Sequence, residues 1–236
     1  MFLDPERENL VQLGMKALRS KDGEKALEYL KVTRGFSDSV IDDFMMGYCP
    51  EDVNHELAGR IITPICDAYG KIVAISSRRM EKDHPFRFFH ESFDKGFYLY
   101  GFHLAKKAIL KTGKCIVVEG EMDVGAFHTH GLNMTVGLCG SALSIFQASM
   151  ILRYCSEVFL LFDSDENQSG QRAAKRALDL YGQHIKSVYG ESNIRFIPVY
   201  LETGIDPDEF VIKNGSDMVI EKLKQAKSKV VNKEVK

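Results

Sequence analysis

Apolar residues recur at helical spacing in the first part of the chain. Between residues 5 and 32, the apolar positions with this spacing are Leu10, Leu13, Ala17, Ala26, Leu27 and Leu30. The pattern predicts two helices separated at Asp22-Gly23, because this pair favours a turn. A third helix is predicted to begin at Ser37, whose hydroxyl can cap it, and to end at Gly47.

Runs of β-branched and aliphatic residues follow. Residues 60–65 and 71–75 predict two strands, and the sequence DAYG at 67–70 predicts the turn between them. From residue 114 onward, strand and helix patterns alternate. The predicted strands lie near 114–119, 133–138, 157–162 and 194–199, and the predicted helices lie at 122–130, 142–154, 169–184 and 207–213, with a last helix from about 216. This alternation predicts an α/β fold with a mostly parallel sheet and helices on both faces.

The change of pattern divides the chain into three segments. Residues 1–112 hold the helices and the first strands, residues 113–215 hold the alternating α/β pattern, and residues 216–236 are expected to form a basic helical tail. We expect this tail to fray and to be solvated, because lysines dominate it. A chain of 236 residues is long enough for one large domain or two small ones with a hydrophobic core.

Apolar runs and cysteines narrow the class of protein. No run of 18 apolar residues and no secretory signal pattern occurs, so we expect a soluble intracellular protein. The five cysteines are odd in number and form no CxxC pair, which argues against disulfides and against zinc in this chain. Cys115 and Cys139 fall in strand-like runs and are predicted to be buried thiols. His128 and His130 face different sides of a helix at this spacing, so shared metal binding is not expected.

The net charge of −2 conceals blocks of opposite sign. Residues 57–112 carry 10 Lys or Arg against 5 Asp or Glu, whereas residues 113–219 carry 8 against 14. A basic segment before an acidic one suits a protein that holds a polyanion on one surface and metal ions at an acidic site. Ordinary variation in surface charge explains the blocks equally well, because neighbours in sequence need not form a patch in space.

Three acidic clusters are the main candidates for chemistry. They are Glu119 in VVEGEMD, Asp163 and Asp165 in LLFDSDENQSG, and Asp206 and Asp208 in GIDPDEF. The first two clusters follow predicted strands, and in open α/β sheets ligands bind at the carboxyl ends of the strands. Converging carboxylates repel one another unless a hard cation lies between them, and oxygen ligands suit Mg²⁺ or Mn²⁺ better than zinc. One such cluster alone is also typical of a solvated turn, but three in series favour a metal site.

The order of these motifs is similar to that of the TOPRIM domain, which is shared by bacterial-type primases, type IA and type II topoisomerases and some nucleases. The matching pieces are Glu119-Gly120 with Asp123, the Gly-Ser-Ala-Leu turn at 140–143, and Asp163-Ser164-Asp165 followed by Gly170. The resemblance implies a Rossmann-like, mostly parallel sheet with helices on both faces in residues 113–215.

Other segments resemble the DnaG-type primases in particular. IDPDEF at 205–210 is similar to a primase motif, and KGFYLYG at 95–101 matches the Lys-Gly-x-x-Leu-Tyr-Gly entry into TOPRIM. Residues 26–50 resemble the start of the primase catalytic core, and residues 59–75 resemble its basic subdomain. The resemblance covers roughly 26–214 and implies a small α+β basic subdomain before the TOPRIM domain.

The chain also departs from the family pattern. Where the family has Gly-Gly-Arg and Pro-Lys-Tyr-x-Asn, this chain has Ser76-Ser77-Arg78 and PFRFF at 85–89, so Arg87 is expected to replace the missing lysine. The family also has a zinc-binding module before the core and a helicase-interacting domain after it, and we expect neither in this chain. The pattern fits a small or viral form of the family, or a core from a longer protein.

The resemblance implies a DNA-directed RNA polymerase, namely a DNA primase catalytic core that makes short RNA primers on single-stranded DNA by metal-dependent nucleotidyl transfer. The implied catalytic residues are Glu119, Asp163 and Asp165. The implied metal ligands are Glu119, Asp163, Asp165, Asp206 and Asp208, with Mg²⁺ or Mn²⁺ as the cofactor. The implied contacts to nucleic acid or nucleotide are Arg60, Arg78, Arg87 and Lys95.

Single-stranded DNA and nucleoside triphosphates are the implied partners, with a replicative helicase and a separate zinc-binding module as further candidates and no membrane. The implied location is the cytoplasm of a bacterial cell or a phage-infected host. Two other functions stay open, a TOPRIM-type metal-dependent nuclease and a catalytically weak nucleic-acid or helicase accessory protein. A topoisomerase is disfavoured, because it needs a tyrosine nucleophile on another domain.

An aromatic group surrounds Arg87, consisting of Phe86, Phe88, Phe89 and Phe93. These rings could stack on single-stranded bases or form the core of a small subdomain. The alternation at 86 and 88 favours the core.

Overall fold

The computed structural model of the chain describes residues 5–53, 56–81, 84–164, 169–180 and 194–234. The chain separates into two compact units, Met1–Phe93 and Asp94–Lys236. The boundary between the two units lies before residue 94 and not after residue 112. Residues 94–112 belong to the second unit because they pack on its sheet. The division of the chain by function, with the catalytic domain beginning at residue 113, stays a prediction.

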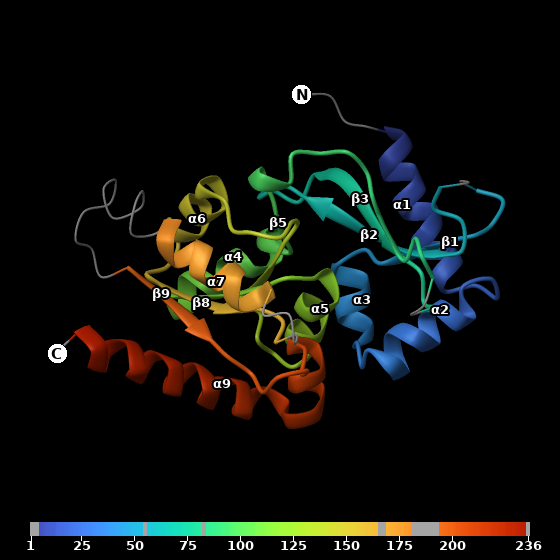
Figure 1. Cartoon of the computed structure of the whole chain (residues 1–236). Coiled ribbons are helices and arrows are strands. Elements are labelled where there is room, and N and C mark those ends of the chain that lie inside the picture. Colours follow the sequence, from blue (N-terminus) through green and yellow to red (C-terminus); the bar gives the residue numbers. More distant parts are fainter. Residues whose placement is uncertain (1–4, 54–55, 82–83, 165–168, 181–193, 235–236) are drawn as a thin grey trace. The chain divides into compact units, whose positions relative to one another are not determined.

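The first unit begins with helices (Figure 1). They are α1 (Pro5–Leu18), α2 (Glu24–Glu28), the π-helical turn η1 (Tyr29–Thr33) and α3 (Asp38–Asp43). Ser37 caps α3 as predicted, because its hydroxyl oxygen accepts a hydrogen bond from the Val40 backbone N–H at 3.3 Å. The helix ends before Gly47, the predicted end, because Met45 adopts a positive φ of 50° and turns the chain into the first strand.

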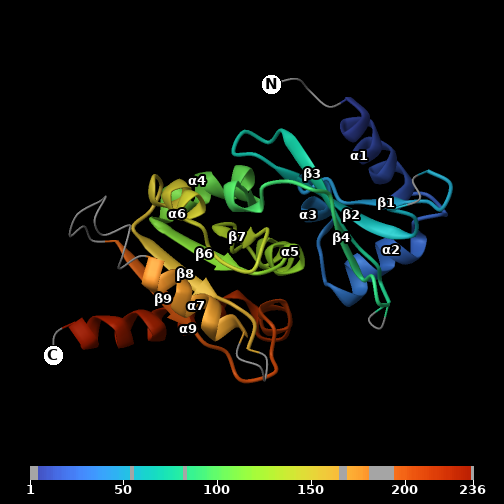
Figure 2. The ribbon, with the colours of Figure 1, turned by 45° about the horizontal axis from the view of Figure 1, so that its top comes forward.

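An antiparallel sheet completes the first unit. Its strands lie in the order β1 (Gly47–Cys49), β2 (Arg60–Cys66), β3 (Ile72–Arg78) and β4 (Phe88–His90). The two predicted strands are confirmed as β2 and β3, and the Asp67 carboxylate closes their turn by accepting the backbone N–H groups of Tyr69 at 2.8 Å and Lys71 at 3.0 Å. Helix α1 packs across this sheet (Figure 2).

The aromatic residues of β4 divide between core and solvent. Phe89 packs against the core cluster that includes Ile62 and Ile75, whereas Phe86 and Phe88 are 73% and 53% exposed. The prediction that positions 86 and 88 belong to the core is therefore wrong. Neighbouring residues of a strand point to opposite faces, so Phe89 facing the core directs Phe88 away from it.

The second unit contains a five-stranded sheet in the order β5-β7-β6-β8-β9. Its strands are β5 (Leu99–Tyr100), β6 (Lys114–Val118), β7 (Thr135–Leu138), β8 (Glu157–Leu161) and β9 (Arg195–Val199). Among these described strands, only the edge strand β5 pairs in antiparallel orientation. The predicted mostly parallel sheet is confirmed, and its central strands are buried because helices cover both faces.

The helices of this unit are α4 (Phe102–Thr112), α5 (Glu121–Thr129), α6 (Ile145–Leu152), α7 (Ser169–Leu180) and α9 (Pro207–Glu234), preceded by the 3-10 turn η2 (Lys95–Phe97). The crossover from β6 to β7 and the return from β7 to β8 run in opposite directions, so right-handed connections place α5 and α6 on opposite faces. Helix α7 packs on β8 and β9, and α9 packs on β9 and α5 (Figure 1).

The last helix is longer and better packed than the sequence predicts. Gly215 interrupts α9 with non-helical angles (φ 76°, ψ 172°), which matches the two helices predicted on either side of it. Beyond this kink, Val219 and Leu223 are buried and Lys227 pairs with Glu157 at 2.5 Å. The expectation of a solvated tail is therefore wrong for this part, because the helix packs by its apolar side.

All five cysteines are buried, and their side chains are thiols. Cys115 and Cys139 are thus buried as predicted, and burial raises the pKa of the Cys139 thiol to about 12. None of the helices in the described ranges combines the length and the hydropathy that crossing a bilayer requires.

Candidate active site

Two of the predicted carboxylates follow neighbouring parallel strands. Glu119 comes directly after β6 and Asp163 comes shortly after β8, and these strands pair in parallel. Glu119 Oε1 accepts a hydrogen bond from the backbone N–H of Asp163 at 3.3 Å. The structure therefore brings Glu119 and Asp163 together at the carboxyl edge of the sheet, the edge at which open α/β folds bind ligands.

A third carboxylate, Asp123, lies in the first turn of α5. Its Oδ2 accepts the Gly120 backbone N–H at 2.9 Å, which is the contact that an acidic residue makes at the third position of a helix. Its Oδ1 accepts the backbone N–H of Asp208 at 3.3 Å. Asp123 therefore holds the first turn of α9, with the buried Asp208, beside the first turn of α5.

Several aspartate carboxylates lie close together at this edge of the sheet. Burial, followed by the charges of Asp208 and Asp163, raises the pKa of Asp123 well above its usual range, and Asp206 adds to the increase. Repulsion of this kind is relieved by a hard cation. The atoms that could bind a cation here are carboxylate oxygens, which are suitable ligands for Mg²⁺ or Mn²⁺.

The structure tests only part of the predicted metal set. Asp165 lies outside the described residues. Asp206 is exposed and directly precedes α9. Within the described ranges, no three His, Cys, Asp or Glu side chains are arranged to hold a metal ion. The ligand set Glu119, Asp163, Asp165, Asp206 and Asp208 therefore stays a prediction.

The turn that carries Asp163 is fixed by its neighbours. The Ser164 hydroxyl donates to the Leu201 carbonyl at 3.3 Å, and the Gly204 N–H donates to the Ser164 carbonyl at 2.6 Å. Gly170 lies against the same turn, because a Cβ there would be 3.0 Å from the Asp163 nitrogen and would clash with its carbonyl oxygen. Only glycine allows this close approach.

Lys95 belongs to the same unit as the carboxylates. A Cβ on Gly140, which follows β7, would lie 3.8 Å from the Lys95 Cβ, so Lys95 lies near the carboxyl end of β7. Strand β7 is parallel to β6, and the two strands therefore end at the same edge as Glu119. The structure thus places Lys95 on the carboxylate side of the sheet.

A buried glutamine fixes the turn of Lys95. Gln147 Nε2 donates to the backbone carbonyls of Lys95 at 3.1 Å and Tyr98 at 2.7 Å. Ser144 and Gln147 also form the capping box of α6, and the Ser144 hydroxyl donates to the Gly96 carbonyl. These contacts, here called the Gln147 network, hold η2 against the start of α6.

Of the predicted nucleic-acid contacts, Arg60 lies in the interior of the first unit. It is 5% exposed, and its Nη1 and Nη2 donate to the backbone carbonyls of Arg87 at 3.1 Å and Phe86 at 2.7 Å. Burial lowers its pKa. The guanidinium therefore holds the segment before β4, and its binding to phosphate stays a prediction.

Arg78 and Arg87 lie against aromatic rings in the same unit. The Arg78 Cζ is 5.6 Å from the centroid of Tyr29 and 5.5 Å from that of Phe88, and the Arg87 Cζ is 5.2 Å from Phe88. Cation–π contacts of this length stabilise the guanidinium without neutralising its charge. Their binding to nucleic acid stays a prediction.

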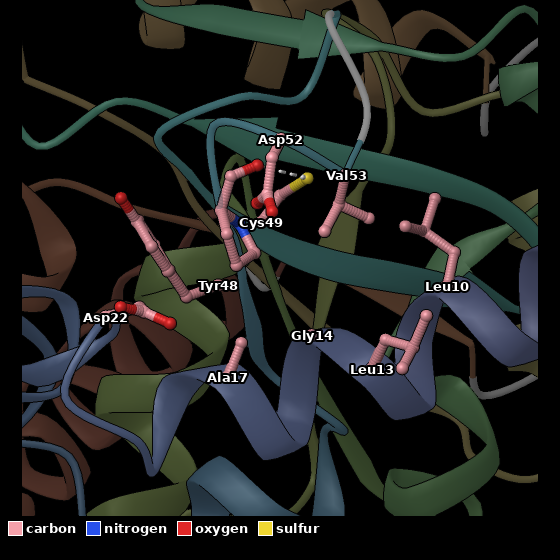
Figure 3. Close-up of a pocket in the computed structure, with 10 residues that line it drawn as sticks. Leu10, Leu13, Gly14, Ala17, Asp22, Tyr48, Cys49, Asp52 and Val53 are labelled. Atoms are coloured by element: carbon pink, nitrogen blue, oxygen red, sulfur yellow. Dashed lines mark hydrogen bonds between the residues drawn. The ribbon is translucent and has the colours of Figure 1, made fainter.

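A cavity of about 230 Å³ lies in the first unit (Figure 3). Apolar side chains of α1, including Leu10 and Leu13, form one side, and residues 48–50, 52 and 53 form the other. The described lining contains Asp22 and Asp52 but no Lys, Arg or His, which makes it unsuitable for a polyphosphate. The acidic edge of the second sheet is therefore the better candidate for the active site.

Sequence reasoning missed three residues that build this site, namely Asp123, Ser164 and Gln147. Asp123 was recognised as part of a motif but not as a member of the carboxylate site, although its spacing from Gly120 is that of a helix-capping residue. Ser144 and Gln147 have the S-x-x-Q spacing of a capping box, which was a readable signal. Nothing in the local sequence points to the Ser164–Leu201 contact.

Comparisons with known proteins agree with this geometry. Residues 116–211 match the model of the Toprim-like family. The DNA primase of Synechocystis sp. is 30% identical in a match that covers 80% of this chain and 35% of that protein. The solved structure of the DnaG catalytic core is similar with a TM-score of 0.80 and 25% identity, over 93% of this chain and 78% of that one. The structure of a DnaG primase catalytic domain bound to single-stranded DNA is similar with a TM-score of 0.79 and 25% identity, over 93% and 79% of the two chains.

The chain matches only part of each DNA primase but nearly all of its own length takes part in the structural match. The chain spans about a third of the length of the curated primase that it matches, 35% in the case of Synechocystis. The structural match extends over both units, since it covers 93% of the chain. The chain therefore carries a TOPRIM domain of the DnaG primase type, within the fold of the DnaG catalytic core.

Proposed function

We propose that this chain is the catalytic core of a DNA primase, which synthesises short RNA primers on single-stranded DNA. The observation that carries the proposal is the meeting of Glu119 and Asp163 with the Asp123–Asp208 contact at one edge of a parallel sheet. The similar catalytic domain bound to single-stranded DNA supports such a strand as the template.

The reaction joins a 3′-hydroxyl to the α-phosphorus of a nucleoside triphosphate and releases pyrophosphate. Mg²⁺ or Mn²⁺ would stabilise the charge on the entering and leaving oxygens. Asp163 and Asp208 would hold the ion, together with Glu119, Asp206 and Asp165. Asp123 acts as a positioning residue in this proposal, because it contacts the backbone of both Gly120 and Asp208.

The remaining roles follow from hydrogen bonding and charge. Glu119 accepts the Asp163 N–H and so lies at the same edge as Asp163. As the general base, its carboxylate would accept the proton of a 3′-hydroxyl that is bound within hydrogen-bonding distance. Lys95 on the same edge would bind phosphate as a point charge, and Arg78 and Arg87 would bind phosphate oxygens of the strand or the triphosphate, as would Arg60.

A template-directed priming assay tests the proposal. The intact chain is incubated with single-stranded DNA, labelled ribonucleoside triphosphates and Mg²⁺ or Mn²⁺, with and without a zinc-binding primase module added in trans. We expect labelled oligoribonucleotides, and we expect none to form when EDTA is present from the start. No product on varied templates with either metal, under both conditions, would refute the proposal.

The same preparation distinguishes a nuclease. When labelled DNA or RNA is added without nucleotides, a TOPRIM-type nuclease would shorten it, whereas a primase core leaves it intact. DNA binding without synthesis or cleavage would indicate an accessory protein. We favour the primase because the likeness to the DnaG core covers 93% of the chain, including the first unit, and is not confined to the TOPRIM domain. A helicase partner and a cytoplasmic location are part of the same proposal.

A further inference from the structure

Two aromatic rings lie exposed in the second unit. Phe97, in η2, is 43% exposed, and Phe146, in α6, is 55% exposed. Their ring centroids are 4.3 Å apart and their planes meet at 30°. The rings are therefore in contact and form one aromatic surface, here called the Phe97–Phe146 pair.

The Gln147 network holds this pair in place. Gly96 precedes Phe97 and accepts a hydrogen bond from the Ser144 hydroxyl, and Gln147 follows Phe146 and donates to the carbonyls of Lys95 and Tyr98. The two rings come from segments far apart in the sequence, yet these bonds fix their backbones against each other. A pair that is ordered before a ligand arrives loses little conformational entropy on binding.

One cation lies on η2 and another reaches the turn before α6 from α7. Lys95 directly precedes Gly96 in η2, and Arg176 of α7 donates through Nη2 to the Ser141 carbonyl at 3.2 Å, in the turn before α6. The Asp94 carboxylate also lies nearby, since its Oδ1 is 3.6 Å from the Cβ position of Gly96. Aromatic rings for bases combined with cations for phosphates are the pattern of single-strand binding surfaces.

We propose that the Phe97–Phe146 pair stacks on a base of single-stranded DNA. This inference rests on the proposed function, and it adds a surface that would hold the strand on the side of the sheet where the carboxylates lie. Stacking tolerates any sequence, because every base has a π face. The cations Lys95 and Arg176 favour a nucleic acid over an apolar partner protein, which would need a larger apolar patch.

Fluorescence anisotropy with a labelled single-stranded oligodeoxynucleotide measures the effect. We expect the double variant Phe97→Ala/Phe146→Ala to bind about 5-fold to 100-fold more weakly than the natural chain. Phe146→Tyr should bind normally because it keeps an aromatic ring, whereas Phe146→Leu should bind as weakly as Phe146→Ala. Leu110→Ala is the matched control, because Leu110 is 64% exposed on α4 and lies in no proposed site.

A strand with an abasic nucleotide at each position in turn locates the stacked base. The natural chain should lose affinity at one position, and the double variant should show no loss there. Lys95→Ala should instead reduce the slope of affinity against salt by about one unit, whereas the ring variants keep the slope. Both rings are exposed, so thermal unfolding should show that the variants fold normally.

The inference would be refuted if the ring variants bound within twofold of the natural chain. It would also be refuted if Phe146→Ala abolished self-association or binding of a protein and left DNA binding unchanged. These outcomes are separable from the proposed function, because DNA binding is measured without nucleotides. A chain that binds DNA through these rings but makes no primer refutes the primase proposal alone, and a chain that makes primers normally with both rings removed refutes the stacking site alone.

Discussion

The two units bury charged side chains in different ways. In the first unit, Arg60 donates to two backbone carbonyls and Arg78 lies against two aromatic rings. In the second unit, the buried Asp123 lies close enough to Asp208 and Asp163 that their charges raise its pKa. A buried cation that donates to backbone carbonyls, as Arg60 does through Nη1 and Nη2, contributes to the stability of the fold, whereas carboxylates that repel one another are suited to bind a cation. Replacing Arg60 should therefore mainly reduce stability, whereas replacing a carboxylate of the acidic edge should mainly reduce activity.

The largest effect is expected for Asp163→Asn. This change removes a proposed metal ligand but retains its shape, so primer synthesis should fall by more than the roughly 10-fold to 100-fold that the loss of an outer metal-site contact causes. Binding to single-stranded DNA should persist. Asp217→Asn is the matched control, because Asp217 is an exposed acid on α9 and no role is proposed for it. Normal synthesis by Asp163→Asn would contradict the assignment.

Arg60→Ala should mainly affect the first unit. Two charge-assisted hydrogen bonds disappear and two carbonyls lose a donor, so the free energy of unfolding should fall by about 2–3 kcal/mol. Chemical denaturation measures this change. Arg87→Ala, whose side chain lies against the exposed Phe88, should be close to the natural chain in stability and should weaken DNA binding. The assignment would be contradicted if Arg87→Ala lowered stability and Arg60→Ala weakened only DNA binding.

Gly170→Ala tests the close approach to the Asp163 turn. The added Cβ would force the turn to move, which should lower the free energy of unfolding by about 1–3 kcal/mol and reduce primer synthesis. Gly140→Ala is the control for stability, because its Cβ would meet Lys95 at an ordinary 3.8 Å. Equal stability of the two variants would show that the turn can yield without cost.

The smallest effect is expected for Arg19→Ala on the surface of the first unit. Lys31 and Arg19 lower the pKa of Asp38 by hydrogen bonding to it. A lowered folded-state pKa means that the stabilisation is present at neutral pH and is lost as the pH falls through that pKa. The variant should thus have a Tm at most about 2 °C lower at pH 7, and the difference should shrink in acid and in high salt. A difference that grows in acid would contradict this reading.

The sequence predicted the second unit more completely than the first. Strands β6 and β8 are apolar runs that are each followed by an acidic motif, so their positions and the placement of Glu119 and Asp163 at one edge could be read directly. In the first unit, β4 is a three-residue edge strand, and three of the four positions 86–89 are aromatic, so the sequence does not show which rings face the core. The exposure of Phe88 therefore depended on its pairing with β3, which is a long-range contact.

Some parts of the site could not be predicted from local sequence either, because they depend on contacts between residues that are far apart in the chain. Asp123 meets Asp208 across 85 residues of sequence, and Gln147 meets Tyr98 across 49. A pattern can show that each residue lies at the start of a helix, but not which helix starts lie side by side. The solvated tail was predicted from its lysines, whereas the burial of Val219 and Leu223 depends on the sheet beneath α9.

Binding of Mn²⁺ to the chain, followed by electron paramagnetic resonance or calorimetry, tests most directly whether the acidic edge is a metal site. We predict saturable Mn²⁺ binding by the natural chain, competition by Mg²⁺, and at least about 10-fold weaker binding by Asp208→Asn, with Asp217→Asn unchanged. Equal affinity of the natural chain and Asp208→Asn, or no saturable binding at all, would contradict the account.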